Sequence, residues 1–93
     1  MSKFAKGKSW IEHRLADAFE VDGRRYTVNL IARKGTGVQG FRVTVAFLPH
    51  DGGEVREVGL PNAASTVEVH GMSRELSDQP DRLAGLFASG AGA

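Results

Sequence analysis

Apolar and polar side chains alternate most regularly between Phe41 and Leu48, where many residues are also β-branched or aromatic. A period of two over this length is typical of a strand with one buried face. Pro49 has no backbone N–H and therefore ends the pattern. We predict a strand over 41–48 whose buried face consists of Phe41, Val43, Val45 and Phe47.

The Asp22-Gly23 pair lies between two further alternating stretches and predicts a tight hairpin. A type I′ turn needs positive φ angles at both central positions, which an Asp-Gly pair supplies. Counting outward from this turn pairs Glu20 with Arg25, Phe19 with Tyr26, Asp17 with Val28 and Leu15 with Leu30. The predicted register joins an opposite-charge pair and an aromatic pair, and it leaves only Asp17 misplaced on the apolar face.

A helix competes with the first strand of this hairpin. Ser9 and Glu12 have the spacing of a capping box. The apolar residues that would share one face of such a helix are Ile11, Leu15, Ala18 and Phe19. We favour a strand over Arg14–Val21, with a short helix over 10–17 as the alternative.

The residues after Pro49 predict a turn at 50–53 and a fourth strand over Glu54–Leu60, which Pro61 stops. Val55 and Val58 are an odd number of positions apart, so they cannot share one face of a regular strand. We therefore expect either a bulge or a partly exposed valine in this segment.

The composition changes after Pro61 and favours a helix. Apolar residues recur at helical spacing through Ala63–Leu76, and Ser65 with Glu68 has the spacing of a capping box. The alternation within Thr66–His70 leaves a fifth strand as the alternative.

A second, shorter helix is predicted to follow. Asp78 is a suitable cap, and Pro80 is well placed in a first helical turn. The apolar stripe of this helix consists of Leu83, Leu86 and Phe87.

These elements predict an α+β domain, with an antiparallel meander of about four strands followed by one or two C-terminal helices packed on one face. We divide the 93 residues into a flexible basic N-terminal arm at 1–8, a single domain at 9–88 and a disordered tail at 89–93. No apolar stretch suits a signal peptide or a membrane span. We therefore expect a cytoplasmic protein without a membrane partner.

The near-neutral formal charge of +1 conceals a split between the halves of the chain. Residues 1–48 carry nine basic and four acidic side chains, whereas residues 49–93 carry three basic and seven acidic ones. Such a split indicates either attraction between the halves, within one fold or between two copies, or an anion-binding half. The absence of Cys excludes disulfides and cysteine zinc sites.

Gly35, Gly37 and Gly40 have the spacing G-x-G-x-x-G, which occurs in phosphate-binding loops. In a dinucleotide-binding unit these glycines open a helix, but here a predicted strand follows Gly40. The kinase glycine loop does join two strands, but it has Val where this chain has Arg42. We interpret the glycines as a hairpin connection that needs no ligand.

The sequence contains no catalytic constellation that we can identify. His13, His50 and His70 lack the spacing of an H-E-x-x-H zinc site, and the serines lack a nucleophile-elbow context. We therefore predict no enzyme activity, no cofactor and no metal site.

The strand pattern places basic and hydrogen-bonding residues on the sheet face opposite the apolar one. The predicted platform contains Arg25, Thr27, Asn29, Arg42 and Thr44. Arginine and lysine in such a platform can neutralise phosphates. The candidate contact residues are Arg25, Arg33, Lys34 and Arg42.

Aromatic residues, which single-strand binding needs for base stacking, are missing from this predicted platform. Tyr26, Phe41 and Phe47 are assigned to the core. Trp10 is interpreted as either a lid on the core or an anchor in an interface.

We predict a small non-catalytic binding or interaction domain that self-associates, because an open sheet exposes two edges and has a thin core. The partner is then a second copy or another protein, and Ile31, Ala46 and Leu48 could belong to the contact. The alternative is a nucleic-acid-binding protein that uses the basic sheet face and the Lys-rich N-terminal arm. Salt separates the two, because only nucleic-acid binding weakens steeply as salt rises.

Overall fold

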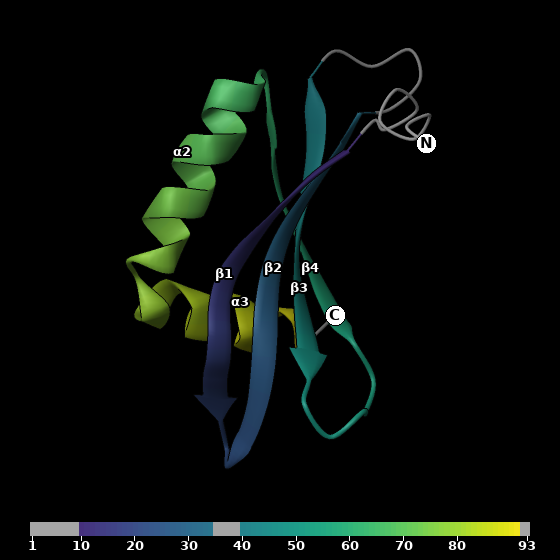
Figure 1. Cartoon of the computed structure of the whole chain (residues 1–93), viewed down its shortest axis with the longest axis vertical. Coiled ribbons are helices and arrows are strands. Elements are labelled where there is room, and N and C mark those ends of the chain that lie inside the picture. Colours follow the sequence, from purple (N-terminus) through teal and green to yellow (C-terminus); the bar gives the residue numbers. More distant parts are fainter. Residues whose placement is uncertain (1–9, 35–39, 92–93) are drawn as a thin grey trace, which may run out of the picture.

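The computed structural model describes residues 10–34 and 40–91. The elements follow one another as β1 (Trp10–Val21), β2 (Arg24–Lys34), β3 (Phe41–Pro49), β4 (Arg56–Ala63), α2 (Thr66–Ser77) and α3 (Pro80–Ala91), as Figure 1 shows. The strands form one antiparallel sheet in chain order. The predicted α+β meander with two C-terminal helices is therefore confirmed.

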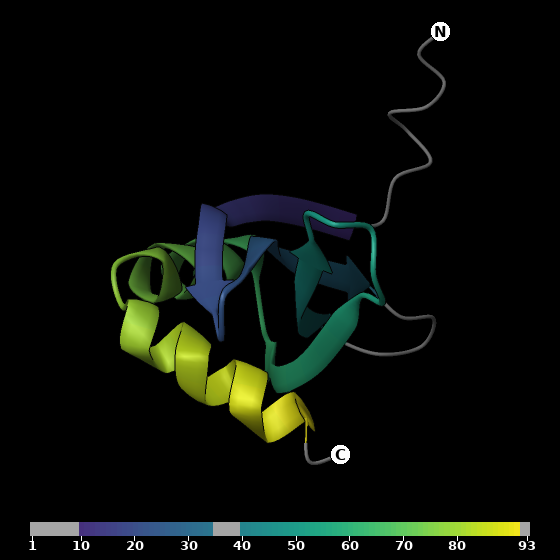
Figure 2. The same cartoon turned by 90° about the horizontal axis from the view of Figure 1, so that it is seen from below.

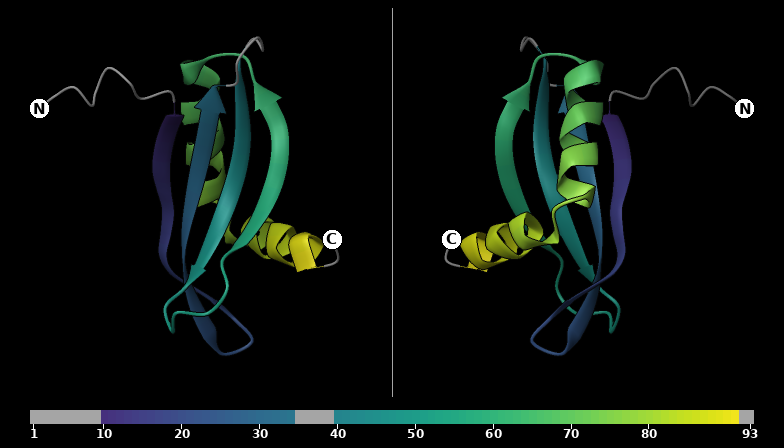
Figure 3. Two further views of the ribbon diagram at one scale, coloured as in Figure 1. Left: turned by 90° about the vertical axis from the view of Figure 1, so that its right-hand side faces the viewer. Right: turned by 90° about the vertical axis from the view of Figure 1, so that its left-hand side faces the viewer.

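Both helices pack on the same face of the sheet, which Figures 2 and 3 show from two directions. α2 runs alongside the strands, and α3 crosses the sheet near the end that holds the β1–β2 turn (Figure 1). In the left view of Figure 3, the strands lie in front of the helices, so the sheet is seen from its other face. Within the described residues, no helix covers that other face, which we call the outer face.

The core lies between the sheet and the helices, and the strand pattern explains its composition. In β2 and β3, every second residue is buried, as a half-buried strand requires. The buried strand residues include Tyr26, Val28, Leu30, Ala32, Val43, Val45 and Phe47. The helices contribute Val69, Leu76 and Leu83 to the same cluster. The predicted buried face of β3 is thus confirmed for Val43, Val45 and Phe47, whereas Phe41 is half-buried and packs against the core.

The turn between β1 and β2 has the predicted conformation. Asp22 and Gly23 both have positive φ angles, of 52° and 82°. Next to the turn, Glu20 pairs with Arg25 and Phe19 with Tyr26, as expected. The structure therefore confirms this end of the hairpin.

The predicted register is wrong farther from the turn, because β1 contains two irregularities. One lies between Arg14 and Ala16 and the other between Ala16 and Phe19. Each adds one residue to β1, so Leu30 pairs with His13 and Val28 pairs with Ala16.

The irregularities also resolve the predicted misfit of Asp17. Its side chain is exposed and its carboxylate accepts a hydrogen bond from Arg14, while Leu15 still reaches the core. β1 starts at Trp10, so a strand rather than the alternative helix occupies residues 10–18.

β4 lies later in the sequence than predicted, at Arg56–Ala63, and it includes Pro61. An edge strand tolerates proline because the missing N–H can face away from the sheet. Val55 precedes the strand and is 49% exposed, which confirms the expected partly exposed valine. Opposite Phe41 and Val43, β4 contains one extra residue, so it also has an irregularity near Pro61.

Helix α2 begins as the capping-box spacing predicts. The Ser65 hydroxyl accepts a hydrogen bond from the Glu68 backbone N–H at 3.3 Å, and Glu68 in turn accepts one from the Ala64 N–H at 2.8 Å. Thr66–Ser77 is therefore helical, and the alternative fifth strand is wrong. Asp78, predicted to cap the last helix, is instead the C-terminal cap of α2.

Helix α3 runs from Pro80 to Ala91, so the tail predicted at 89–93 shares three residues with it. Residues 92–93 and the arm predicted at 1–8 lie outside the described residues. Of the glycine motif, Gly35 and Gly37 also lie outside them. Neither described helix is long and apolar enough to cross a membrane.

Candidate functional site

The outer face of the sheet is the surface that strand alternation assigns to polar residues. Its positions follow from the pairing of β1 to β2 and of β2 to β3, because paired residues point to the same side. The face comprises Trp10, Glu12, Arg14 and Glu20 from β1, Arg25, Thr27, Asn29, Ile31 and Arg33 from β2, Arg42, Thr44, Ala46 and Leu48 from β3, and Glu57 and Gly59 from β4.

Three of these residues form a row across one end of the face. Trp10 pairs with Arg33, and Arg33 pairs with Arg42, so the three side chains leave neighbouring strands on the same side. Neighbouring strands are about 4.8 Å apart, so the row spans about 10 Å. We call these residues the Trp-Arg-Arg row. All three are exposed.

The structure shows no acidic partner for the two arginines of the row among the residues that it describes. Among the described residues, neither Arg33 nor Arg42 forms an ion pair. Like charges directly opposite each other in a sheet repel, which destabilises the fold. The row therefore concentrates two uncompensated positive charges beside an indole ring.

The nearest carboxylate on the face is engaged elsewhere. Glu12 accepts a hydrogen bond from the Asn29 amide at 3.0 Å. Asn29 accepts one from Arg14 at 2.9 Å, and Arg14 donates to Asp17 at 2.6 Å. This chain runs along β1 and β2 away from the row, so it draws Glu12 toward Asn29 rather than toward Arg33.

The structure separates the four basic residues that the sequence grouped together. Arg33 and Arg42 are neighbours, but Arg25 is eight residues from Arg33 on the same strand. That separation is about 26 Å in an extended strand. Arg25 also lies 4.0 Å from a carboxylate oxygen of Glu20. Arg25 therefore does not belong to the same site.

Lys34 is at the right end of the sheet but on the wrong face. It pairs with Phe41, next to the buried pair of Ala32 and Val43. Its ammonium lies 5.9 Å from the centre of the Phe41 ring. Lys34 is thus at the rim of the helix-covered side, where it cannot join the row directly.

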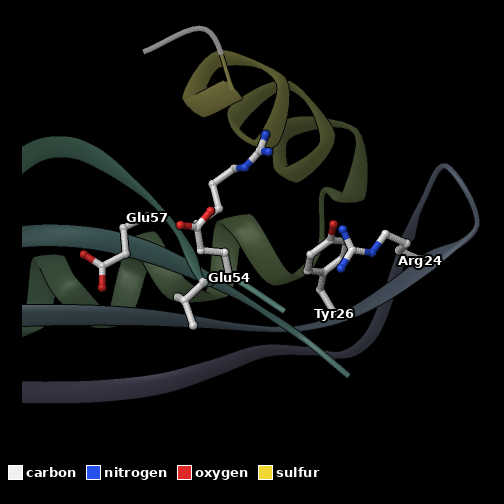
Figure 4. Close-up of a pocket in the computed structure, with 6 residues that line it drawn as sticks. Arg24, Tyr26, Glu54 and Glu57 are labelled. Atoms are coloured by element: carbon white, nitrogen blue, oxygen red, sulfur yellow. The ribbon is translucent and has the colours of Figure 1, made fainter. Parts of the chain in front are cut away.

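A second polar region lies at the opposite end of the molecule, where a hollow of about 410 Å³ is lined by Arg24, Tyr26 and residues 54–57. Figure 4 shows Arg24 beside Tyr26 at one end and Glu54 and Glu57 at the other. The guanidinium of Arg24 donates to both carboxylate oxygens of Asp51 at 3.0–3.2 Å.

These contacts shift the titration of both Arg24 and Asp51. The hydrogen bond from the Gly53 N–H, together with that from Arg24, lowers the pKa of Asp51. The hydrogen bond to Asp51 raises the pKa of Arg24. The charge of Arg24 is therefore satisfied within the turn.

The other guanidinium of the hollow is also occupied. Arg56 lies 4.2 Å above the Phe87 ring and donates to the Phe87 carbonyl at 3.2 Å. With both guanidiniums held by the protein and two carboxylates at the rim, the hollow has little to offer an anion.

The histidines occupy structural positions. His50 Nε2 lies 3.0 Å from the Thr27 hydroxyl and 3.1 Å from the Asp17 carbonyl, so it ties the β3–β4 turn to β1 and β2. His13 and His70 pack edge to face between β1 and α2, with ring centres 4.6 Å apart. In the described part of the chain, no three His, Asp or Glu side chains are grouped to hold a metal ion.

Trp10 is the site residue that sequence reasoning did not place. The predicted strand began only at Arg14, and the pairing of Trp10 with Arg33 depends on two irregularities that shift the register of β1. The one available signal was local: Ile11 packs on the core, so its neighbour Trp10 must point the other way. The aromatic residue that seemed to be missing from the platform is thus present at its edge.

Comparison of the chain with protein-family models, curated proteins and solved structures finds no match.

Proposed function

We propose that this domain is a non-catalytic module that binds the phosphate backbone of nucleic acid through the outer face, with Arg33 and Arg42 as the principal contacts. The observation that carries the proposal is the direct pairing of two exposed arginines that lack acidic partners among the described residues. Arginine offers five N–H donors in a planar fork that matches phosphate oxygens. An anion placed over this pair relieves their mutual repulsion.

Features of the sheet edges also favour this function over self-association through the edges. β1 carries two irregularities and alternating charged residues, and β4 carries Pro61 with an irregularity of its own. Bulges, charges and proline are the features by which edge strands avoid pairing with other chains. A partner is therefore more readily accepted on the outer face than along either edge.

Fluorescence anisotropy of labelled random oligonucleotides, single-stranded and double-stranded, tests the proposal at about 50 and 200 mM salt. Two neutralised phosphates give a salt slope of about −1.4 for a single strand, so the affinity should fall about sevenfold between these concentrations. Arg33→Glu and Arg42→Glu should each lower the affinity about tenfold at the lower salt, because each removes a charge-assisted hydrogen bond.

Arg25→Glu is the matched control, since it makes the same change in charge on the same strand. It lies about 26 Å from the row, which is about two Debye lengths at about 50 mM salt, so it should change the affinity by only about twofold. Equal losses in all three variants would indicate a general effect of net charge and would contradict the proposed site.

Self-association through the outer face is the second candidate, and the centre of that face favours it. Ala46 is only 3% exposed there, and Ile31 and Leu48 are half-buried without a covering helix among the described residues. Light scattering at increasing protein concentration tests this candidate. If the face forms a dimer, Leu48→Glu should shift the mass to that of a monomer, and a wild-type monomer at all concentrations would contradict it.

A further inference from the structure

The orientation of Trp10 sets the kind of nucleic acid that could occupy the outer face. Trp10 is the first residue of β1 and is 46% exposed. Ile11, the next residue, packs against the core on the opposite side of the sheet. The indole is therefore assigned to the outer face, on the side of the sheet away from the core.

The row combines the two groups that a single strand needs. Indole rings stack on the faces of bases, and this works with any base because every base has a π face. Both guanidiniums lie to one side of the indole, on the next two strands, where they can contact phosphates of a strand whose base stacks on Trp10. Directly opposite side chains in a sheet have Cβ atoms about 4.5–5.5 Å apart, which is within the reach of both kinds of contact.

We propose that Trp10 is a base-stacking residue and that the outer face therefore binds single-stranded rather than double-stranded nucleic acid. This inference rests on the proposed function and specifies its ligand. In a duplex the bases are stacked inside the helix, and only their edges and the phosphates are accessible from outside. A duplex could contact the two arginines but would leave the indole without a stacking partner.

The next row of the face bears on the choice of base. It consists of Glu12, Ile31 and Thr44, so a base next to the Trp-Arg-Arg row would meet a carboxylate that Asn29 already engages, an apolar side chain and a hydroxyl. Neither Ile31 nor Thr44 has a fixed pattern of donors and acceptors that reads one base. We therefore expect binding with little preference for sequence, as stacking and phosphate contacts alone provide.

Trp10 is the only tryptophan of the 93 residues, so its fluorescence reports on this position alone. The first experiment titrates wild-type protein with three probes at about 50 mM salt: an unlabelled single strand of about 12 nucleotides, the matching duplex, and inorganic polyphosphate. The single strand should quench the emission of Trp10. The duplex and polyphosphate should bind more weakly or without comparable quenching, because neither supplies a free base.

The second experiment compares Trp10→Leu with Trp10→Phe. Leucine keeps an apolar side chain but has no π face, so it should weaken single-strand binding about fivefold or more, while polyphosphate binding stays within about twofold. Phenylalanine can stack and should restore most of the affinity. A thermal melt of each variant confirms that folded proteins are compared. The quenching experiment uses only wild-type protein, so it does not depend on whether the variants fold.

The outcomes separate this inference from the proposed function. Single-strand binding without quenching, or a Trp10→Leu variant as tight as wild type, would overturn stacking but leave phosphate binding intact. Duplex binding as tight as single-strand binding would do the same. Absence of binding to all three probes would overturn both. A Trp10 emission that changes with protein concentration alone would place the indole in an interface between two copies and also overturn stacking.

Discussion

Arg33 and Arg42 illustrate a conflict between stability and binding at a pair of residues. Paired residues in the middle of a sheet normally complement each other, yet these two repel. Nothing in the fold requires the charges, because both side chains are exposed and threonine would suit the same backbone. Residues that oppose folding in this way are commonly retained for function.

Replacing one of the arginines should therefore stabilise the protein while weakening binding. We expect Arg33→Thr to raise the free energy of unfolding by about 0.2–1 kcal/mol, because it removes the repulsion and places a β-branched residue in a strand. Urea denaturation of wild type and variant measures this difference. A loss of stability in the variant would show that Arg33 supports the fold and would weaken the argument for a binding role.

Gly40 is the second residue whose identity has a physical cause. Its φ angle is 83°, and a Cβ at this position would collide with the carbonyl oxygen of Ala63. Gly40 therefore allows the chain to enter β3 close to the end of β4. For this glycine, backbone geometry provides a sufficient explanation without a phosphate ligand.

Gly40→Ala should destabilise the protein by about 1–3 kcal/mol, since alanine adds both backbone strain and a steric clash. Gly71→Ala is the control, because Gly71 is exposed in α2 and has open space around it. Alanine at that position should instead stabilise the helix by up to about 1 kcal/mol. Thermal denaturation of both variants checks the pair, and a neutral Gly40→Ala would contradict the close approach.

At the scale of elements, local patterns predicted those strands and helices whose signals lie within the element itself. The alternation of β3, the Asp22-Gly23 turn and the Ser65 cap are examples, and each is confirmed. The bulges of β1 were not predictable, because an extra residue in a strand has no local signature. The far register of β1 was wrong for this reason, whereas Trp10 was missed because the predicted strand began only at Arg14.

The candidate site was predictable only in part. Alternation correctly put Arg33 and Arg42 on one face, and counting along β3 from its core residues was enough to do so. Alternation also puts Lys34 on the opposite face of the sheet from these two arginines. The prediction from sequence nevertheless grouped Lys34 with them because it is close to them along the chain. Arg25 was included because it lies on the same face as Arg33. The two residues are eight positions apart on β2, however, so Arg25 lies at the other end of the strand.

The β3–β4 turn provides a prediction about pH. The Gly53 N–H and Arg24 lower the pKa of Asp51 in the folded protein. A lowered folded pKa means that the carboxylate contributes stability above its unfolded pKa of about 3.9, and that this contribution is lost as the pH falls through the folded value. Because the pair is exposed, the contribution should be small.

Asp51→Asn should accordingly lower the melting temperature slightly at neutral pH, and the difference from wild type should shrink below a pH of about 4. Asp22→Asn removes a carboxylate from the neighbouring turn and is the control; Asp22 has no ion pair among the described residues. A difference that persists unchanged into acid would mean that Asp51 acts through the shape of the turn rather than through its charge.

At the scale of the whole molecule, the charge split of the sequence does not become a difference between two layers. The helices on one side carry Glu68, Glu75 and Asp81 against Arg74 and Arg82. On the other side, the outer face carries Arg14, Arg25, Arg33 and Arg42 against Glu12, Glu20 and Glu57. Arg24, Lys34 and Arg56 lie on the helix-covered side. The positive charge that would attract a polyanion is therefore concentrated at the Trp-Arg-Arg row rather than spread over a whole layer.

We propose that nucleic acid binds at the Trp-Arg-Arg row, and backbone amide NMR spectra recorded during titration with a single-stranded oligonucleotide are the sharpest test. We expect shifts at Trp10, Arg33, Arg42 and Thr44, together with the indole N–H. Glu75 and Arg82 on the helices should not respond. Shifts confined to α2 and α3, or no shifts at low salt with a folded protein, would contradict it.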